Sequence, residues 1–344
     1  MPCRFESGRP YQIPARSAPS AGAAGTDTKR SDTGRPAGSA GITTISLSKT
    51  ESKPEPEPVR MQDPQIAPFK TQLLKWVGTK QRFAHEIASH LPPDFGTYFE
   101  PFLGGGGVMA TLQPKRALGS DIFAPLVEIW QTLSTDPGLL VAWYAERHAQ
   151  FEAGDRTAAY EAIKARYNQS PNGADFLFLC RACYGGVVRF RRRDGHMSTP
   201  CGSHPVISPE KFARRVALWQ VRMAGARFAC LDYRHAMAQA RAGDVVYCDP
   251  PYAHSQSILY GAQSFRLEEL FAAITACKAR GVRVALSIDG TKKSGDVYCD
   301  IPIPPGLFER EIFVNMGQSM LKRFQMSGQR MQSEAVRDRL LLTY

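Results

Sequence analysis

Short apolar runs with the spacing of buried strands occur in two separate parts of the chain, before and after a long helical block. The runs contain β-branched or aromatic residues and are bounded by glycine, proline or acidic residues, as the strands of an α/β sheet are. A helix is expected over 267–280, between the last two runs. The expected strands cover residues 98–99, 116–122, 227–231, 244–248 and 282–288.

The block over 136–225 has a different pattern, in which apolar residues recur at helical spacing. This spacing is clearest over 141–144 and 158–163. We therefore predict an α/β fold in which residues 69–135 and 226–344 form one domain. The mainly helical block is expected to be inserted into the sheet of that domain.

Residues 1–68 lack the apolar side chains that could build a core. Ser, Ala and Gly dominate the early part, and Pro alternates with Glu over 54–58, so the composition is that of a linker or a disordered segment. Met61 lies where the composition changes. This position suggests the hypothesis that synthesis starts at Met61.

The charge and cysteine content narrow the class of protein. A formal net charge of +11 suits a polyanionic partner, although it carries no information about the fold. Eight cysteines without paired spacing do not indicate an oxidising compartment. No signal peptide and no run long enough to span a bilayer are visible, so we expect a soluble, cytoplasmic protein without membrane contact.

The most informative motif is Asp249, Pro250, Pro251 and Tyr252, which follows the apolar run 244–248. Open α/β sheets bind their ligands at the carboxyl ends of strands. The prolines fix the backbone, and their carbonyl oxygens can accept hydrogen bonds beside the Asp249 carboxylate and a flat ring. Such a row of acceptors suits the exocyclic amino group of a planar base. A surface turn is the alternative, because Asp-Pro and Pro-Pro also mark loops.

A second motif is the glycine loop 104–107, which follows the strand expected at 98–99. Glycine permits positive φ and close approach of a ligand, but the spacing is not that of a phosphate-binding loop. Asp121 follows at the distance at which an acid reaches ribose hydroxyls, although a helix N-cap would also suit it. Upstream, Trp76 and Lys80 flank a glycine, and form either a turn or the cover of a nucleoside-type cofactor.

The order of these motifs resembles the Dam-like, class α DNA adenine methyltransferases. The matching motifs are Lys-Trp-x-Gly-x-Lys, Glu-Pro-Phe-x-Gly-Gly-Gly, Ser-Asp-Ile and Asp-Pro-Pro-Tyr, and the resemblance extends over 72–344. It implies a Rossmann-like methyltransferase sheet, S-adenosyl-L-methionine as cofactor and double-stranded DNA as substrate. The cofactor-binding residues that we assign on this basis are Trp76, Lys80, Glu100, Phe102, Gly104, Gly105, Gly106, Asp121 and Asp249.

The resemblance also implies that the target adenine is received by residues 249–252. Its amino nitrogen is enclosed in the duplex, so the base must be extruded before it can react. We expect Tyr252 to stack on the extruded ring, and Asp249 and the Pro250 carbonyl to accept the two amino hydrogens. The nitrogen lone pair then attacks the methyl group directly, and no covalent enzyme intermediate is needed.

Four arginines of the helical block precede an Asp-Gly pair that is typical of a hairpin. They are Arg189, Arg191, Arg192 and Arg193. Alternation predicts that the first, second and fourth of them share one face. A charged edge that discourages strand pairing is the alternative, and we predict contact with DNA phosphates. The resemblance supports this prediction, because Dam-like enzymes carry a β-hairpin in a target-recognition domain.

The same block departs from the form associated with GATC methylation. It has Leu-Cys-Arg at 179–181, Tyr-Gly-Gly at 184–186 and Ser-Thr-Pro at 198–200. The GATC form has Leu-Asn-Arg, aromatic-Asn-Gly and Asn-x-Pro at these places. A GATC target is therefore not implied.

Other functions use similar residues. An N4-cytosine methyltransferase needs the same acceptors, although that class is associated with Ser where Asp249 stands. RNA methylation is compatible with the basic segment, and a catalytically silent DNA-binding protein is the non-enzyme alternative. A monomer is expected, and the sequence leaves open whether a cognate restriction endonuclease accompanies the chain.

A zinc site is a further alternative in the helical block. Cys180 and Cys183 form a lone C-x-x-C, with His196, Cys201 and His204 nearby, and sulfur and nitrogen ligands suit zinc. No second pair follows at standard spacing. We therefore predict no metal and interpret the two cysteines as buried apolar residues.

Overall fold

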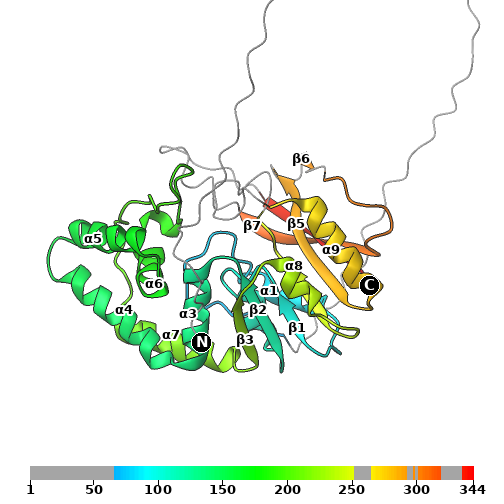
Figure 1. Ribbon diagram of the computed structural model, residues 1–344, viewed down its shortest axis with the longest axis horizontal. Coiled ribbons are helices and arrows are strands. Elements are labelled where there is room, and N and C mark those ends of the chain that lie inside the picture. Colours follow the sequence, from blue (N-terminus) through cyan, green and yellow to red (C-terminus); the bar gives the residue numbers. More distant parts are fainter. Residues whose placement is uncertain (1–65, 252–264, 293–296, 299–300, 319–334) are drawn as a thin grey trace, which may run out of the picture. The chain divides into compact units, whose positions relative to one another are not determined.

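The computed structural model describes residues 66–251, 265–292, 297–298, 301–318 and 335–344. Within them a mixed sheet carries helices on both faces (Figure 1). The strand order is β3-β2-β1-β4-β5-β8-β7, and β6 pairs with β5. The strands are β1 Tyr98–Glu100, β2 Ala117–Asp121, β3 Ala226–Cys230, β4 Val245–Cys248, β5 Arg283–Lys292, β6 Val297–Tyr298, β7 Arg310–Gln318 and β8 Ala335–Leu342.

The direction in which strands are added to the sheet reverses at β1. Strands β3, β2, β1, β4 and β5 are parallel, whereas β8 runs antiparallel to both β5 and β7. The chain adds β2 on one side of β1 and β4 on the other. Open α/β sheets bind ligands outside the carboxyl ends of the strands at such a reversal.

The sheet separates two apolar layers. Successive side chains of a strand point to opposite faces, so Tyr98 and Val245 enter one cluster of buried residues while Phe99 and Val246 enter the other. Helices cover both layers, as a parallel sheet requires. On the first layer lie α1 Ala84–Ser89, α2 Gly107–Leu112 and α3 Ala124–Thr135, and on the second lie α8 Tyr233–Ala238 and α9 Leu267–Ala279.

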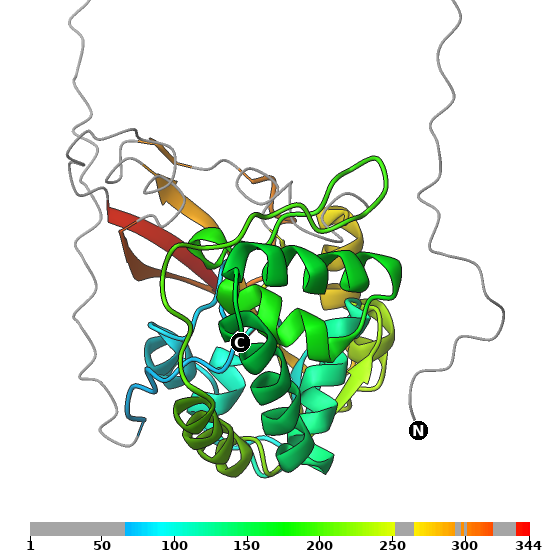
Figure 2. The same ribbon diagram turned by 90° about the vertical axis from the view of Figure 1, so that its left-hand side faces the viewer.

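The helical prediction for 136–225 is confirmed (Figure 2). The helices are α4 Pro137–Glu152, α5 Arg156–Gln169, α6 Gly173–Ala182 and α7 Pro209–Arg222, with a 3-10 turn η1 over Tyr184–Gly186. Each of the four α-helices begins after a side chain that accepts a hydrogen bond from the first turn, namely Asp136, Asp155, Asn172 and Ser208. One apolar cluster runs from these helices to the sheet, so the division into 69–135, 136–225 and 226–344 stays a prediction.

In the part of the chain that the structure describes, no helix combines the length and the apolar character needed to cross a membrane.

A buried carboxylate joins three of these helices. Asp175 of α6 is fully buried and accepts hydrogen bonds from Arg147 Nε of α4 and Arg166 Nε of α5, both at 2.9 Å. Asn172 Nδ2 donates a further bond at 3.0 Å. A buried charge is stable only when it is paired and hydrogen-bonded, so Asp175 fixes how α4, α5 and α6 meet.

We expect Asp175→Ala to lower the free energy of unfolding by about 3 kcal/mol, because it leaves the guanidinium groups without their shared carboxylate. Asp155→Ala is the matched control, since it removes an exposed capping carboxylate worth about 1 kcal/mol. Urea unfolding of both variants measures the difference. Equal losses in the two variants would contradict the structural role given to Asp175.

Candidate active site

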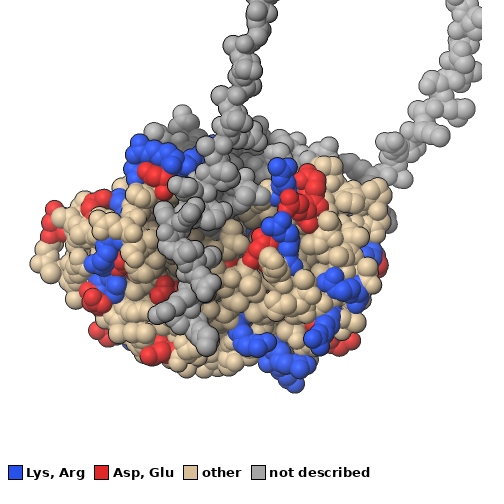
Figure 3. All heavy atoms as spheres, viewed as in Figure 1, with Lys and Arg blue, Asp and Glu red and all other residues tan. Residues whose placement is uncertain are grey.

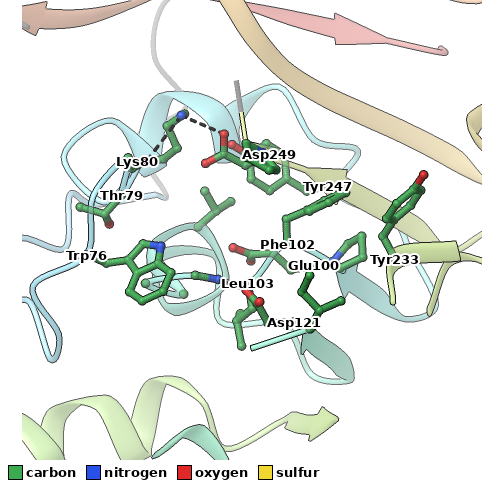
Figure 4. A pocket seen from close by; sticks show the side chains of 18 of the residues that line it. Trp76, Thr79, Lys80, Glu100, Phe102, Leu103, Asp121, Tyr233, Tyr247 and Asp249 are labelled. Atoms are coloured by element: carbon green, nitrogen blue, oxygen red, sulfur yellow. Dashed lines mark hydrogen bonds and ion pairs between the residues drawn. The ribbon is translucent and has the colours of Figure 1, made fainter. Parts of the chain in front are cut away.

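A cavity of about 240 Å³ opens beside the carboxyl ends of β1 and β4. Figure 4 shows side chains from the segment before α1, from the loop after β1 and from the end of β4 around it. The residues predicted from the sequence that line it are Trp76, Lys80, Glu100, Phe102, Gly104, Gly105, Gly106, Asp121, Asp249 and Pro251. Pro250 immediately precedes the last of these, and Tyr252 lies outside the described residues. The structure brings this set together, and the role of each residue stays a prediction.

The glycine loop is packed between two tryptophans. Gly104 has a φ of +46°, and a Cβ at this position would lie 2.7 Å from Trp76 Nε1. On the other side, Trp130 Nε1 donates a hydrogen bond to the Gly104 carbonyl at 3.1 Å. Gly106 has a φ of +61°, with the Trp130 ring 3.3 Å from where its Cβ would be. Both the backbone conformation and the space therefore require glycine.

Asp121 does not cap the following helix, so that alternative from the sequence is wrong. The N-cap of α3 is Phe123, without a capping side chain. The Asp121 carboxylate instead accepts hydrogen bonds from the backbone N–H groups of Gly104 and Phe123, both at 3.1 Å. It ties the glycine loop to the start of α3 at the wall of the cavity.

Trp76 belongs to a turn and also forms a wall of the cavity. Its carbonyl accepts a bond from the Thr79 N–H at 3.4 Å, which closes the turn. Its indole ring lies edge-on to Phe176, with centroids 6.2 Å apart, and 6.4 Å from Phe123. The two interpretations of this segment are therefore compatible, because the turn places the ring.

A buried ammonium group lies between two carboxylates at one end of the cavity. Lys80 Nζ is 2.8 Å from Asp249 Oδ1 and 3.3 Å from Asp338 Oδ2. Burial lowers the pKa of Lys80, but Asp249 and Asp338 outweigh that effect, so the net pKa is raised. Sequence reasoning missed Asp338, because it comes from β8 at the end of the chain and no motif surrounds it.

The opposite wall contains residues that the sequence analysis also missed. Tyr233 stacks on Phe102, with centroids 5.1 Å apart and an interplanar angle of 25°, and Phe265 meets Phe102 edge-on at 5.9 Å. The Tyr233 Oη atom is buried without a hydrogen-bond partner in the described part of the chain. Asp232 and Glu269 line the same wall. The available signal was the Asp-Tyr pair just after β3, which ends at the same edge of the sheet as β1.

Glu100 is a buried acid within the cavity wall. Burial is the main cause that raises its pKa to about 8; the hydrogen bond from Tyr98 opposes this, and the charge of Asp249 adds to it. Glu100 Oε2 accepts bonds from the Tyr98 hydroxyl and from the Met109 N–H, both at 3.0 Å. The carboxyl therefore joins β1 to α2 and stays protonated at neutral pH.

This pKa predicts how stability depends on pH. Between pH 4.5 and about 8 the folded protein keeps a proton on Glu100 that the unfolded chain releases, so stability falls as the pH rises through that window. In Glu100→Gln this contribution disappears, because the amide does not titrate. We expect the melting temperature of the variant to fall less than that of the wild type between pH 5.5 and 8. If the melting temperatures of the two proteins fell equally over this pH range, the result would contradict the raised pKa of Glu100.

The arginine segment reverses direction, but it forms isolated bridges and no continuous ladder. Phe190 pairs with Met197, and the Arg191 N–H donates to the His196 carbonyl at 2.9 Å. Residues 192–194 form the turn, so the predicted alternation is wrong at Arg193, which lies in that turn. The exposed Arg193 side chain contacts Asp194, with Nε 3.2 Å from Oδ2.

Hydrogen bonds from α5 hold the return limb of this segment. The Asn168 side chain accepts from the Met197 N–H at 2.8 Å and donates to the Met197 carbonyl at 3.1 Å. The buried Tyr160 hydroxyl donates to the Thr199 carbonyl at 2.9 Å. Figure 3 shows Lys and Arg in several separate groups over this face, with Asp and Glu among them. The arginine segment is thus a local cationic feature on an anchored loop.

The two cysteines of the C-x-x-C are buried. Their thiols donate to backbone carbonyls, Cys180 to Leu177 at 3.3 Å and Cys183 to Cys180 at 3.6 Å. Burial raises the pKa of Cys180 to about 11 and that of Cys183 to about 12. Among the described residues, no three His, Cys, Asp or Glu side chains are grouped to hold a metal ion.

Three known proteins that are similar to this chain are named as methylases or methyltransferases. The retron Ec67 DNA adenine methylase of Escherichia coli is 33% identical over 187 residues, which cover 52% of this chain and 63% of that protein. The DNA adenine methylase of Vibrio cholerae serotype O1 is 27% identical over 241 residues, 65% of this chain and 83% of that protein. The Type II methyltransferase M.MjaIII of Methanocaldococcus jannaschii is 27% identical over 209 residues, 55% of this chain and 70% of that protein.

The family of D12 class N6 adenine-specific DNA methyltransferases matches residues 76–308. This match covers more than half of the chain and includes every described residue that the sequence analysis assigned to the cofactor. It begins at Trp76, ahead of the glycine loop, and extends beyond β4 and its Asp-Pro-Pro motif. The chain therefore belongs to the D12 class N6 adenine-specific DNA methyltransferases.

Proposed function

We propose that the chain transfers a methyl group from S-adenosyl-L-methionine to the N6 amino group of adenine, at a specific site in double-stranded DNA, after extruding the base. The observation that carries this proposal is the Asp249 carboxylate. It lies at the carboxyl end of β4, beside a cavity bounded by the glycine loop, and is held there by Lys80. The family match favours adenine over cytosine and DNA over RNA.

The residues of the cavity fit S-adenosyl-L-methionine. Because Gly104 has no side chain, its backbone lies directly against the Trp76 ring that lines the cavity, and Asp121 offers a carboxylate suited to ribose hydroxyls. The buried Tyr233 Oη supplies a polar atom without a partner in the described residues. S-adenosyl-L-methionine, when bound, supplies an electrophilic methyl group and keeps the electron pair of the broken bond as a neutral thioether.

The chain's own groups then act on the target amine. Asp249 and the Pro250 carbonyl accept the two amino hydrogens, which draws the nitrogen lone pair out of conjugation with the ring. As that lone pair forms the new N–C bond, positive charge develops on the nitrogen and one of its protons is released. A carboxylate beside the nitrogen stabilises this charge most strongly where water is excluded. Tyr252, whose predicted role is to stack on the base, completes the assignment.

The direct test is to incubate the full chain with labelled S-adenosyl-L-methionine and, in parallel reactions, plasmid DNA or RNA, then to digest the nucleic acid and identify the modified base. N6-methyladenine is the expected product. N4-methylcytosine, labelled RNA in place of DNA, or DNA binding without label would each support one of the alternatives and overturn the proposal.

We expect Asp249→Asn to lower kcat by at least about a hundredfold, because the amide cannot stabilise the charge on the nitrogen as a carboxylate does. Binding of DNA should change little. Asp244→Asn is the matched control, since Asp244 is an acid at the amino end of the same strand that bonds the backbone N–H of Thr97. Single-turnover methylation and DNA affinity are measured for both. A variant at Asp249 with the turnover of the control would remove this residue from the reaction.

We assign the inserted residues 136–225 to target recognition and Arg189, Arg191, Arg192 and Arg193 to phosphate contacts. The anchored loop presents the last two as exposed side chains. We infer that the chain acts as a monomer. The match to a Type II methyltransferase is compatible with a cognate restriction endonuclease as a partner.

Combined replacement of Arg191, Arg192 and Arg193 by Ala should weaken DNA binding and flatten its salt dependence. Each lost phosphate contact lowers the slope of log K against log salt by about 0.9, so three contacts account for about 2.7. Binding of the cofactor should stay unchanged, since none of the three residues lines the cavity. Affinity titrations at several salt concentrations measure this slope. An unchanged slope in the triple variant would indicate that the segment is a solvated charged loop without phosphate contacts.

A further inference from the structure

A second acid shares the ammonium group that holds Asp249. Lys80 Nζ lies 2.8 Å from Asp249 Oδ1 and 3.3 Å from Asp338 Oδ2, and the Lys80 side chain is only 5% exposed. Both distances are those of charge-assisted hydrogen bonds or close ion pairs. Asp338 is itself buried. The position of the ammonium is thus set from two sides.

The backbone at Asp338 is fixed by the sheet. Strand β8 lies between two partners, and Asp338 is in register with Asp289 of β5 and with Val314 of β7. Lys80, by contrast, comes from the segment between the Trp76 turn and α1. Asp338 therefore places a carboxylate from the antiparallel part of the sheet beside a side chain from an irregular segment.

Asp338 also adds a negative charge beside the Lys80–Asp249 pair. We infer that Asp338 is a positioning residue for methyl transfer: it fixes the Lys80 ammonium and, through it, the Asp249 carboxylate, and it adds negative charge near the reacting groups. This inference rests on the proposed function.

The charge has a consequence for catalysis. This added charge attracts a sulfonium cation and stabilises the positive charge that develops on the amino nitrogen. It has no such effect on the neutral thioether that remains after the transfer. Asp338→Asn removes this charge and the ion pair that position 338 makes with Lys80.

The test compares wild type, Asp338→Asn and Asp338→Glu in the full chain on duplex DNA. At saturating cofactor we expect Asp338→Asn to lower kcat roughly tenfold, with a KM for DNA within about twofold of wild type, and Asp338→Glu to restore part of the loss. Asp338→Ser removes the same charge from a smaller side chain and replaces the asparagine variant should that variant not fold.

A second measurement reports the charge without turnover. Sinefungin carries a cationic amine in place of the methylsulfonium group, whereas S-adenosylhomocysteine is a neutral thioether. The ratio of their dissociation constants by calorimetry should shift against sinefungin by roughly three- to tenfold in Asp338→Asn. In Asp244→Asn, the buried-acid control from the other end of β4, both kcat and this ratio should stay at wild-type values even where the melting temperature falls.

The outcomes separate the two proposals. A wild-type chain that does not methylate adenine in duplex DNA overturns the proposed function. A wild type that does so, with an Asp338→Asn variant of equal kcat and equal probe ratio, overturns the inference about Asp338 alone. The same holds if the loss of kcat in Asp338→Asn is matched by Asp244→Asn at an equal melting temperature, because the role would then be structural.

Discussion

An ammonium group that is buried away from water has to be paired, and at Lys80 this constraint ties three distant parts of the chain together. Lys80 precedes α1, Asp249 ends β4, and Asp338 belongs to β8. An unpaired charge at such a position costs several kcal/mol, whereas two carboxylates offset the desolvation of one cation. The position of the acid of the Asp-Pro-Pro motif therefore depends on the packing of the segment before α1 against β4 and β8.

The glycine loop obeys a second constraint, which is steric. Trp76 and Trp130 approach it from opposite sides, and Asp121 bonds the Gly104 N–H while Trp130 bonds its carbonyl. No free space remains for a side chain at this position. Because Trp76 also precedes Lys80 by one turn, the packing of the loop and the pairing of the ammonium fix the same short segment. The two walls of the cavity are thus not independent of each other.

Much of this site could be predicted from the sequence because its parts are local. Strand, glycine loop and acid lie within one stretch around β1 and β2, and the Asp-Pro-Pro motif directly follows β4. Asp338 could not be found in this way, since its place depends on an antiparallel register. Tyr233 had a local signal in the Asp-Tyr pair after β3, but its relevance depends on the strand order. The N-cap prediction for Asp121 was wrong for a related reason. The Asp121 carboxylate bonds the N–H of Gly104 in the glycine loop, which lies 17 residues earlier in the chain.

The arginine segment shows where local pattern and tertiary context diverge. An Asp-Gly pair between extended residues predicts two paired strands, yet the limbs meet only at isolated bridges. The return limb also bonds to Asn168 and Tyr160 of α5, through the backbone groups of Met197 and Thr199. A loop held from behind in this way keeps its tip exposed, with Arg192 and Arg193 in the turn. Because contacts within the protein already order the loop, little binding free energy is lost in ordering it when a polyanionic partner binds.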